Sequence, residues 1–162
     1  MSLQYIIDGC NITHNPSFLN NSSGKLGDTR AGLIDIIWHD KLCGSSNNRA
    51  WVVFDGYPGN FAGEDLTGNT KVLFSCDISA DDRIKQMLER CANPLNTILV
   101  SNDKELAYFA RGCRVRVISV EKFMAGAKNA ALLRRKDPAC EAKVSFSVMH
   151  RINEELKKIW LK

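Results

Sequence analysis

The chain has 162 residues, of which 44% are hydrophobic and 25% charged, a composition typical of one globular domain with its own core. No apolar run is long enough to cross a membrane and no signal peptide is visible, so we expect a soluble cytoplasmic protein. The six cysteines and three histidines are scattered without the spacing of a zinc site or a disulfide framework, which argues against both.

The formal net charge of +4 is unevenly distributed along the chain. Residues 128–162 contain nine Lys and Arg against four Asp and Glu, whereas residues 1–127 contain thirteen against fourteen. We expect residues 1–127 to form the main domain and residues 128–162 to be a basic extension, ending in an amphipathic helix and packed on the same domain. Such an extension suits a polyanionic substrate, although a solvated basic helix without a partner explains the charge equally well.

Strand and helix patterns alternate along the chain, which predicts an α/β fold with a mostly parallel five-stranded sheet. The strand patterns cover residues 3–7, 51–54, 70–75, 97–100 and 114–118. The helix patterns cover residues 28–42, 79–91, 102–110, 120–127 and 148–159. The polar stretch 9–27 is too long for an ordinary connection, and we expect it to be a functional or mobile loop.

Acidic residues follow these strands. Asp8, Asp55 and Asp103 each end or closely follow an apolar run, and Asp81 and Asp82 begin the helix after the third strand. Because the carboxyl ends of parallel strands line one edge of a sheet, we expect four segments to bring carboxylates to one crevice. Their mutual repulsion requires a cation, and acidic oxygen ligands suit Mg²⁺ or Mn²⁺. The pattern indicates metal-dependent phosphoryl chemistry.

The acids that end strands also have local explanations. Asp8 or Asn11 could form an Asx turn at the start of the loop, and Asp55-Gly56 is a common turn dipeptide. A carboxylate at the end of a buried strand is costly unless it is paired or binds a metal. The presence of the other acids favours a ligand role for Asp8.

The acids at helix starts have a capping alternative. Ser79 and Asp82 form an S-x-x-D capping box, which accounts for Asp82 without any catalytic role. Asn102 and Glu105 offer a second capping box, so Asp103, which lies between them, could be only an acid of the first helical turn. Asp81 is less well explained by capping and is the better catalytic candidate.

Basic side chains are candidate contacts for phosphate, although ordinary surface charge explains each of them almost as well. The candidates are Arg30, Arg83, Lys104, Arg134, Arg135 and Lys136.

Four segments, "YIIDGCNI", "VVFDG", "VLFS…SADDRI" and "VSNDKEL", resemble in order and spacing the NYN domains of the YacP type, a branch of the PIN-like nucleases. The resemblance covers residues 4 to 125 and implies a three-layer α/β/α sandwich with Mg²⁺- or Mn²⁺-dependent cleavage of RNA. Cys10 is a departure, since related sequences usually carry an aromatic residue there.

The resemblance also implies a set of site residues. Asp8, Asp81 and Asp103 would form the acidic site, with Asp55 and Asp82 close by. Asn11 and Ser101 would be the polar supports of that pocket, and Ser79 and Asn102, which lie beside the acids in the sequence, are further candidates for this role. Some relatives act on messenger RNA at the ribosome, so the resemblance makes RNA and the ribosome candidate partners of this chain.

We therefore expect a cytoplasmic endoribonuclease in which one or two divalent ions activate a water for attack on single-stranded RNA. Two alternatives stay open. A small-substrate metal-dependent phosphohydrolase is disfavoured because no D-x-D pair follows the first strand. A non-catalytic module that binds RNA or the ribosome is disfavoured because a binder has no need of the acidic set.

Overall fold

The computed structural model describes residues 2–19, 29–59 and 69–126, all within the first of two units into which the contacts divide the chain, Met1–Asn129. The strands are β1 (Gln4–Asp8), β2 (Arg49–Phe54), β3 (Thr70–Phe74), β4 (Thr97–Val100) and β5 (Arg116–Ile118). The helices are α1 (Gly9–Thr13), α2 (Pro16–Leu19), α3 (Thr29–His39), α4 (Ala80–Glu89), the 3₁₀ turn η1 (Pro94–Asn96) and α5 (Lys104–Gly112), and residues 120–126 are also helical.

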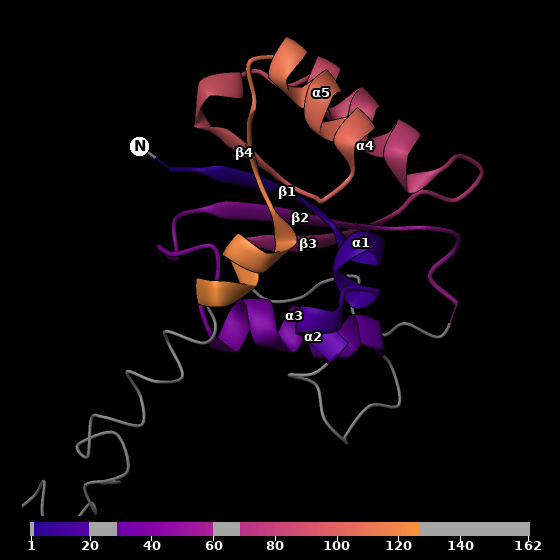
Figure 1. Cartoon of the computed structure of the whole chain (residues 1–162), viewed down its shortest axis with the longest axis vertical. Coiled ribbons are helices and arrows are strands. Elements are labelled where there is room, and N and C mark those ends of the chain that lie inside the picture. Colours follow the sequence, from indigo (N-terminus) through magenta and orange to yellow (C-terminus); the bar gives the residue numbers. More distant parts are fainter. Residues whose placement is uncertain (1, 20–28, 60–68, 127–162) are drawn as a thin grey trace, which may run out of the picture. The chain divides into compact units, whose positions relative to one another are not determined.

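The five strands form one sheet in the order β3-β2-β1-β4-β5, and every pairing is parallel. The predicted five-stranded parallel sheet is therefore confirmed (Figure 1). Successive strands run from β1 to β3 on one side, and β4 then returns to the other side of β1. The order reverses between β1 and β4, and the crevice outside the carboxyl ends at such a switch point is where open α/β sheets bind ligands.

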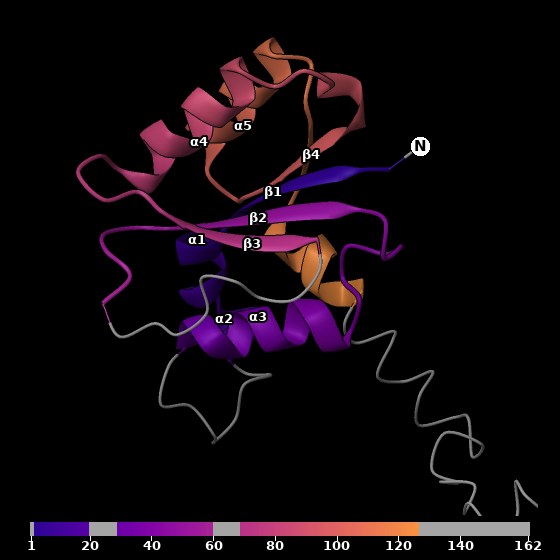
Figure 2. The ribbon, with the colours of Figure 1, turned by 180° about the vertical axis from the view of Figure 1, so that it is seen from behind.

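Helices cover both faces of the sheet, so the predicted three-layer sandwich is also confirmed. Helices α1, α2 and α3 lie on one face and α4 and α5 on the other (Figures 1 and 2). Side chains of β1 alternate between the two layers: Tyr5 and Ile7 pack in the core under α3, whereas Ile6 packs under α4 and α5. Both faces of the central strands are therefore buried, as their continuous apolar sequences predict.

Capping residues set the start of α4 and α5. The hydroxyl of Ser79 accepts a hydrogen bond from the backbone N–H of Asp82 at 3.0 Å, which confirms the predicted cap. The predicted cap of α5 is wrong, because Asp103 caps this helix by accepting from the N–H of Leu106 at 2.8 Å. The side-chain oxygen of Asn102 instead accepts from the N–H of Val120 at 2.9 Å.

The loop expected over residues 9–27 is wrong for its first half, where the chain forms α1 and α2. The carboxylate of Asp8 caps α1 by accepting from the N–H of Asn11 at 2.9 Å, and both Ile12 and Phe18 are fully buried in the core. Helices of four or five residues are too short to show a period, which is why composition alone suggested a loop.

Two expectations concern residues that the structure does not describe. The second half of that loop, residues 20–27, and the basic extension 128–162 with its helix lie outside the described residues. Within the described ranges, each helix is too short or too polar to cross a membrane.

Candidate metal and nucleic-acid site

Four carboxylates line one cavity of about 600 Å³ at the carboxyl edge of the sheet. Asp8 ends β1, Asp55 follows β2, Asp81 lies in the first turn of α4 and Asp103 caps α5. The other lining residues are Cys10, Asn11, His14, Asn15, Pro16, Ala80 and Asn102. The structure thus brings together carboxylates from four segments of the chain at the point where the strand order reverses.

Asp8 is the most enclosed of these acids, with 4% of its surface exposed. Burial raises the pKa of its carboxyl group, the Asn11 N–H and the Ser101 hydroxyl lower it, and the nearby Asp81 and Asp55 raise it further. Ser101 donates to Oδ2 of Asp8 at 3.0 Å. A carboxylate that is held in place yet disfavoured as an anion is stabilised by a bound cation.

Asp55 joins the end of β2 to the start of α4. Its Oδ1 accepts from the N–H of Ala80 at 2.7 Å and from the Ser75 hydroxyl at 3.4 Å. The Ser75 hydroxyl in turn accepts from the N–H of Gly56 at 3.1 Å. One oxygen of Asp55 is therefore used to position α4, and the carboxylate still faces the cavity.

Asp81 is the least constrained acid of the cavity, because it accepts no hydrogen bond from any residue that the structure describes. Partial burial is the main factor that raises the pKa of its carboxyl group, followed by the negative charge of Asp103, while the Lys85 ammonium lowers it. Both of its oxygens are available to a ligand.

Asp103 and Asp8 are linked through Ser101. The buried Ser101 hydroxyl accepts from the N–H of Asp103 at 3.0 Å while it donates to Asp8. Oδ1 of Asp103 caps α5, and Oδ2 has no hydrogen-bond partner among the described residues. One oxygen of Asp103 is therefore also available.

A polar network supports the rim of the cavity. Oδ1 of Asn11 accepts from the N–H of Asn102 at 3.1 Å, and the Asn102 amide donates to Glu121 at 2.7 Å. The Asn15 amide donates to the same carboxylate oxygen at 2.8 Å, and these two amides, Asn15 first, help to lower the pKa of Glu121. The network fixes α1, the β4–α5 loop and the helix at 120–126 relative to one another.

Several cavity residues were not predicted from the sequence. His14 lines the cavity, and its Nδ1 lies 2.7 Å from the carbonyl oxygen of Cys10. Cys10 is half-buried, and its Sγ accepts from the N–H of Asp55 at 3.2 Å. No sequence signal marks Glu121, whereas His14 and Asn15 could have been found by recognising α1 as a continuation of the Asp8 segment.

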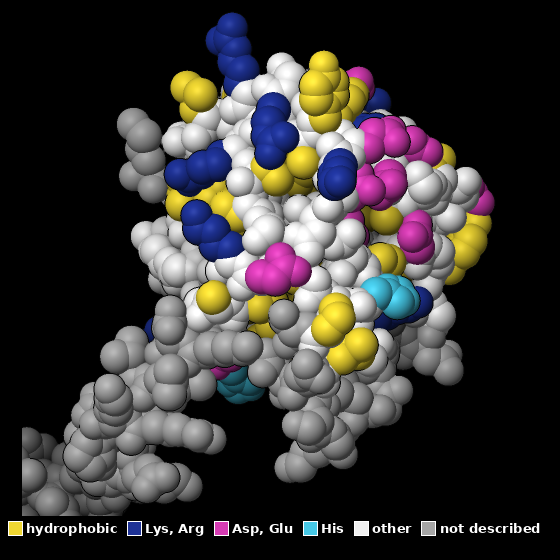
Figure 3. Space-filling view, in the orientation of Figure 1, with side chains coloured by type: hydrophobic (Ala, Val, Ile, Leu, Met, Phe, Trp, Pro, Cys, Tyr) yellow, Lys and Arg dark blue, Asp and Glu magenta, His cyan; other side chains and the backbone are white. Residues whose placement is uncertain are grey.

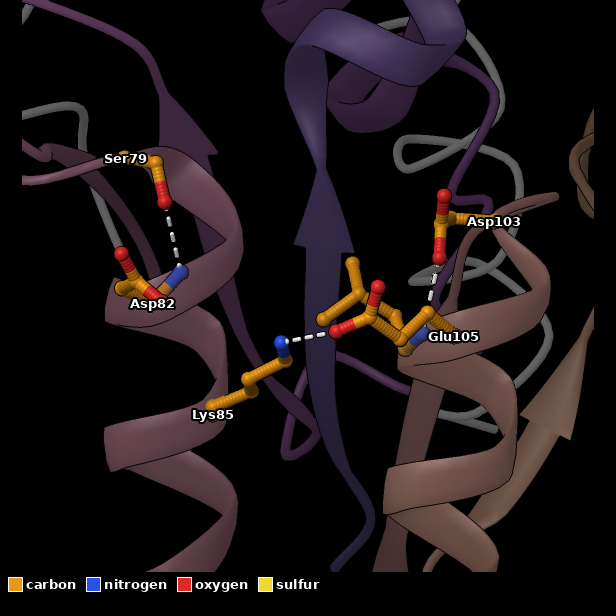
Figure 4. Close-up of polar contacts among 6 residues, drawn as sticks. Ser79, Asp82, Lys85, Asp103 and Glu105 are labelled. Carbon is orange, nitrogen blue, oxygen red and sulfur yellow. Dashed lines mark hydrogen bonds and ion pairs between the residues drawn. The ribbon is translucent and has the colours of Figure 1, made fainter.

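Three of the predicted metal and pocket-support residues do not line the cavity. Ser101 is buried and acts on the cavity only through its hydrogen bonds with Asp8 and Asp103. Asp82 is exposed, and Ser79 serves as the cap of α4. Figure 4 shows this pair on the side of α4 away from Asp103, while the Lys85–Glu105 ion pair spans α4 and α5. Neighbouring helical residues differ by about 100° in direction, which explains how Asp81 reaches the cavity and Asp82 does not.

The candidate phosphate contacts are dispersed. The Arg30 guanidinium carbon lies 5.8 Å from the ring centroid of Phe54 and 5.6 Å from that of Phe74. Nε of Arg83 is buried and has no hydrogen-bond partner among the described residues, whereas Lys104 is exposed beside the cavity. The three candidates at residues 134–136 lie outside the described residues.

The donor set suits a hard divalent cation, since carboxylate, amide and hydroxyl oxygens are the ligands of Mg²⁺ and Mn²⁺. Among the described residues, no three His, Cys, Asp or Glu side chains converge into a complete metal site. Mg²⁺ commonly keeps several waters and takes only one or two carboxylates together with substrate phosphates. The cavity therefore fits an open, hydrated ion and not a metal enclosed by protein ligands.

A parallel α/β sandwich with an acidic crevice at its switch point is the arrangement of a PIN-like nuclease domain. The chain belongs to the YacP-like NYN domain family, whose model matches residues 5–161 and confirms the resemblance seen in the sequence.

Two crystal structures of Rae1 (YacP) from Bacillus subtilis share the fold. One is 18% identical with a TM-score of 0.64 and covers 100% of this chain and 94% of its own. The other, of the W164L mutant, is 19% identical with a TM-score of 0.63, and the match covers 92% of this chain and 91% of the mutant chain. None of the curated proteins compared with the chain matches it.

Proposed function

We propose that this protein is a divalent-metal-dependent endoribonuclease that cleaves single-stranded RNA in the cytoplasm. The observation that carries the proposal is the meeting of Asp8, Asp55, Asp81 and Asp103 in one cavity at the switch point of the sheet. A set of mutually repelling carboxylates on four segments is costly for the fold and is explained by a cation that the cavity binds.

The chain's own residues divide the work of binding and orientation. Asp8, Asp81 and Asp103 would hold one or two Mg²⁺ or Mn²⁺ ions, with Asp55 contributing directly or through water. An ion bound there supplies a Lewis acid and an activated water for hydrolysis of the phosphodiester. Asp8 is oriented by its two hydrogen bonds, while Asp81 is free to follow the substrate.

Helix ends also favour a phosphate at this place. Both α4 and α5 begin beside the cavity, at Ala80 and at Lys104. The positive ends of helix dipoles stabilise anions, so these helices offset part of the carboxylate charge and attract the RNA backbone. Unpaired RNA is the substrate that a groove at a sheet edge admits most readily, because its backbone and bases are accessible.

The test is cleavage of a 5′-labelled single-stranded RNA by the full-length chain with Mn²⁺, with Mg²⁺ or with chelator. We expect metal-dependent cutting that leaves a 5′ phosphate, and loss of about 10³-fold or more in Asp8→Asn. Asp82→Asn is the matched control, because Asp82 lies one residue from the cavity without lining it. Products ending only in 2′,3′-cyclic phosphate would contradict the mechanism.

The same assay separates the alternatives. Hydrolysis of p-nitrophenyl phosphate without cleavage of RNA would favour a small-substrate phosphohydrolase. A binding module would be favoured if the chain binds RNA but does not cleave it, either as free RNA or on translating ribosomes. Cleavage only on ribosomes would keep the nuclease and make the ribosome its partner.

A further inference from the structure

A groove between α5 and β5 continues from the acidic cavity. Its volume is about 460 Å³, and it shares Asn102 and Asp103 with that cavity. One further wall is formed by Lys104, Tyr108 and Arg111 of α5. The facing wall includes Val117 of β5 and Ser119, which follows that strand. The acidic cavity therefore opens at one side into a second depression of different chemistry.

The groove wall on α5 presents a cation, an aromatic ring and a second cation in line. Lys104, Tyr108 and Arg111 are spaced i, i+4, i+7, which places them on one face of the helix. Tyr108 is 80% exposed, although burial of a ring of that size would be favourable. No ion pair holds Lys104 or Arg111 within the described part of the chain.

The surrounding surface has the same sign of charge. Figure 3 shows Lys and Arg side chains gathered over α5 and β5, with Asp and Glu side chains grouped beside them toward α4. A basic surface that borders an acidic metal site suits a polyanion whose backbone crosses from one to the other. An exposed tyrosine between two cations suits an unstacked base with a phosphate on either side.

We propose that the groove between α5 and β5 holds the RNA strand next to the cleaved phosphate, with a base stacked on Tyr108 and flanking phosphates on Lys104 and Arg111. This assignment rests on the proposed function, since it names the path by which the substrate of that site enters. From Asp103 to Arg111 the helix rises about 12 Å, enough for a short run of nucleotides.

The test measures binding apart from cleavage. The full-length Asp8→Asn chain is titrated, without divalent metal, into a fluorescein-labelled unstructured single-stranded RNA, and anisotropy gives the Kd. Adding Tyr108→Ala should raise the Kd by about 5- to 150-fold, and Tyr108→Trp should restore binding. Adding Arg111→Gln should lower the slope of log K against log salt by about 0.7.

Controls of the same kind lie on distant surfaces. Trp38 on α3 is 55% exposed on the other layer of the sandwich, and Lys71 is exposed on β3, the opposite edge strand from β5. Trp38→Ala and Lys71→Gln should leave both the Kd and the salt slope unchanged. Circular dichroism of each variant checks that the fold is intact.

The outcomes separate this proposal from the nuclease proposal. If the wild-type chain cuts RNA but Tyr108→Ala and Arg111→Gln bind like their parent, the groove assignment is overturned and the nuclease stands. If both variants bind weakly while the wild-type chain cuts no RNA, with or without translating ribosomes, the groove stands as an RNA-binding site and the nuclease fails. The groove assignment is also overturned if the Asp8→Asn parent binds no RNA. It is likewise overturned if the parent binds duplex RNA as tightly as single-stranded RNA and Tyr108→Ala does not change the Kd.

Discussion

The hydroxyl of Ser101 donates a hydrogen bond to Oδ2 of Asp8 at 3.0 Å, and this bond joins the carboxyl ends of β4 and β1. These strands are the neighbours between which the strand order reverses. The orientation of Asp8, the most buried acid, is therefore set by the sheet itself. The Ser101 hydroxyl also accepts a hydrogen bond from the N–H of Asp103 at 3.0 Å. A single side chain positions one carboxylate and the start of the helix that carries another.

Ser101→Ala should separate positioning from stability. The variant removes the donor to Asp8 and leaves the N–H of Asp103 without its acceptor, so we expect kcat/KM for RNA cleavage and affinity for Mn²⁺ to fall by about 10- to 100-fold. Cleavage is measured at a temperature where denaturant curves show the variant fully folded. A loss of unfolding free energy with unchanged kcat would mean that Ser101 has only a structural role.

Asp81 and Asp82 form a natural pair for a cleavage assay. Asp81 lines the cavity with both oxygens available, whereas Asp82 lies outside it. We expect Asp81→Asn to reduce cleavage by about 10³-fold or more and Asp82→Asn to change it by less than about threefold. Equal losses in the two variants would show that α4 is rotated relative to this description, and would place Asp82 at the metal.

Much of the fold could be predicted from the sequence because burial on both faces makes the strands read as continuous apolar runs. The spacing of Ile84 and Leu88 and the cap at Ser79 likewise marked α4. The two short helices after β1 were not predictable in this way, since α1 depends on a cap from Asp8, a residue first interpreted as a ligand. Because Asp8 both caps α1 and lines the cavity, its interpretation as a ligand left its capping role, and therefore α1, unpredicted.

The site was partly visible because strand ends in a parallel sheet share an edge, so the positions of Asp8, Asp55 and Asp103 imply proximity. The capping box favoured Asp81 over Asp82 as the catalytic acid of α4, but Asp82 stayed a candidate metal ligand, since the acid that faces the cavity depends on the rotation of the helix. The sequence could not reveal Glu121, whose contacts with Asn15 and Asn102 are made across the fold.

Gly9 tests the packing behind the site. A Cβ at this position would overlap the ring of Phe54, so Gly9→Ala should lower the free energy of unfolding by about 1–3 kcal/mol through overpacking. Gly112→Ala is the control, because a Cβ there meets no atom within 4 Å. We expect that variant to be neutral or up to about 1 kcal/mol more stable in urea denaturation. Full stability of Gly9→Ala would contradict the close approach to Phe54.

Asp8→Asn should stabilise the metal-free protein, and the gain should depend on pH. The folded-state pKa of Asp8 is raised above its ordinary value of 3.8, so the protonated carboxyl favours folding below that pH. This contribution is lost as the pH rises through the higher folded-state pKa. The gain in unfolding free energy from Asp8→Asn should therefore be smallest in acid and reach about 0.5–2 kcal/mol at neutral pH.

Added Mn²⁺ should reverse the order of stability at neutral pH. An ion that binds only the folded wild-type chain stabilises it by about 2.7 kcal/mol at a concentration one hundred times the Kd. Asp8→Asn lacks one carboxylate and gains little, so its free energy of unfolding should rise less with metal than that of the wild type. Denaturant curves across a pH series, with Mn²⁺ and with chelator, measure both effects. Identical metal responses in the two proteins would exclude Asp8 as a ligand, because binding through that carboxylate requires a difference between them.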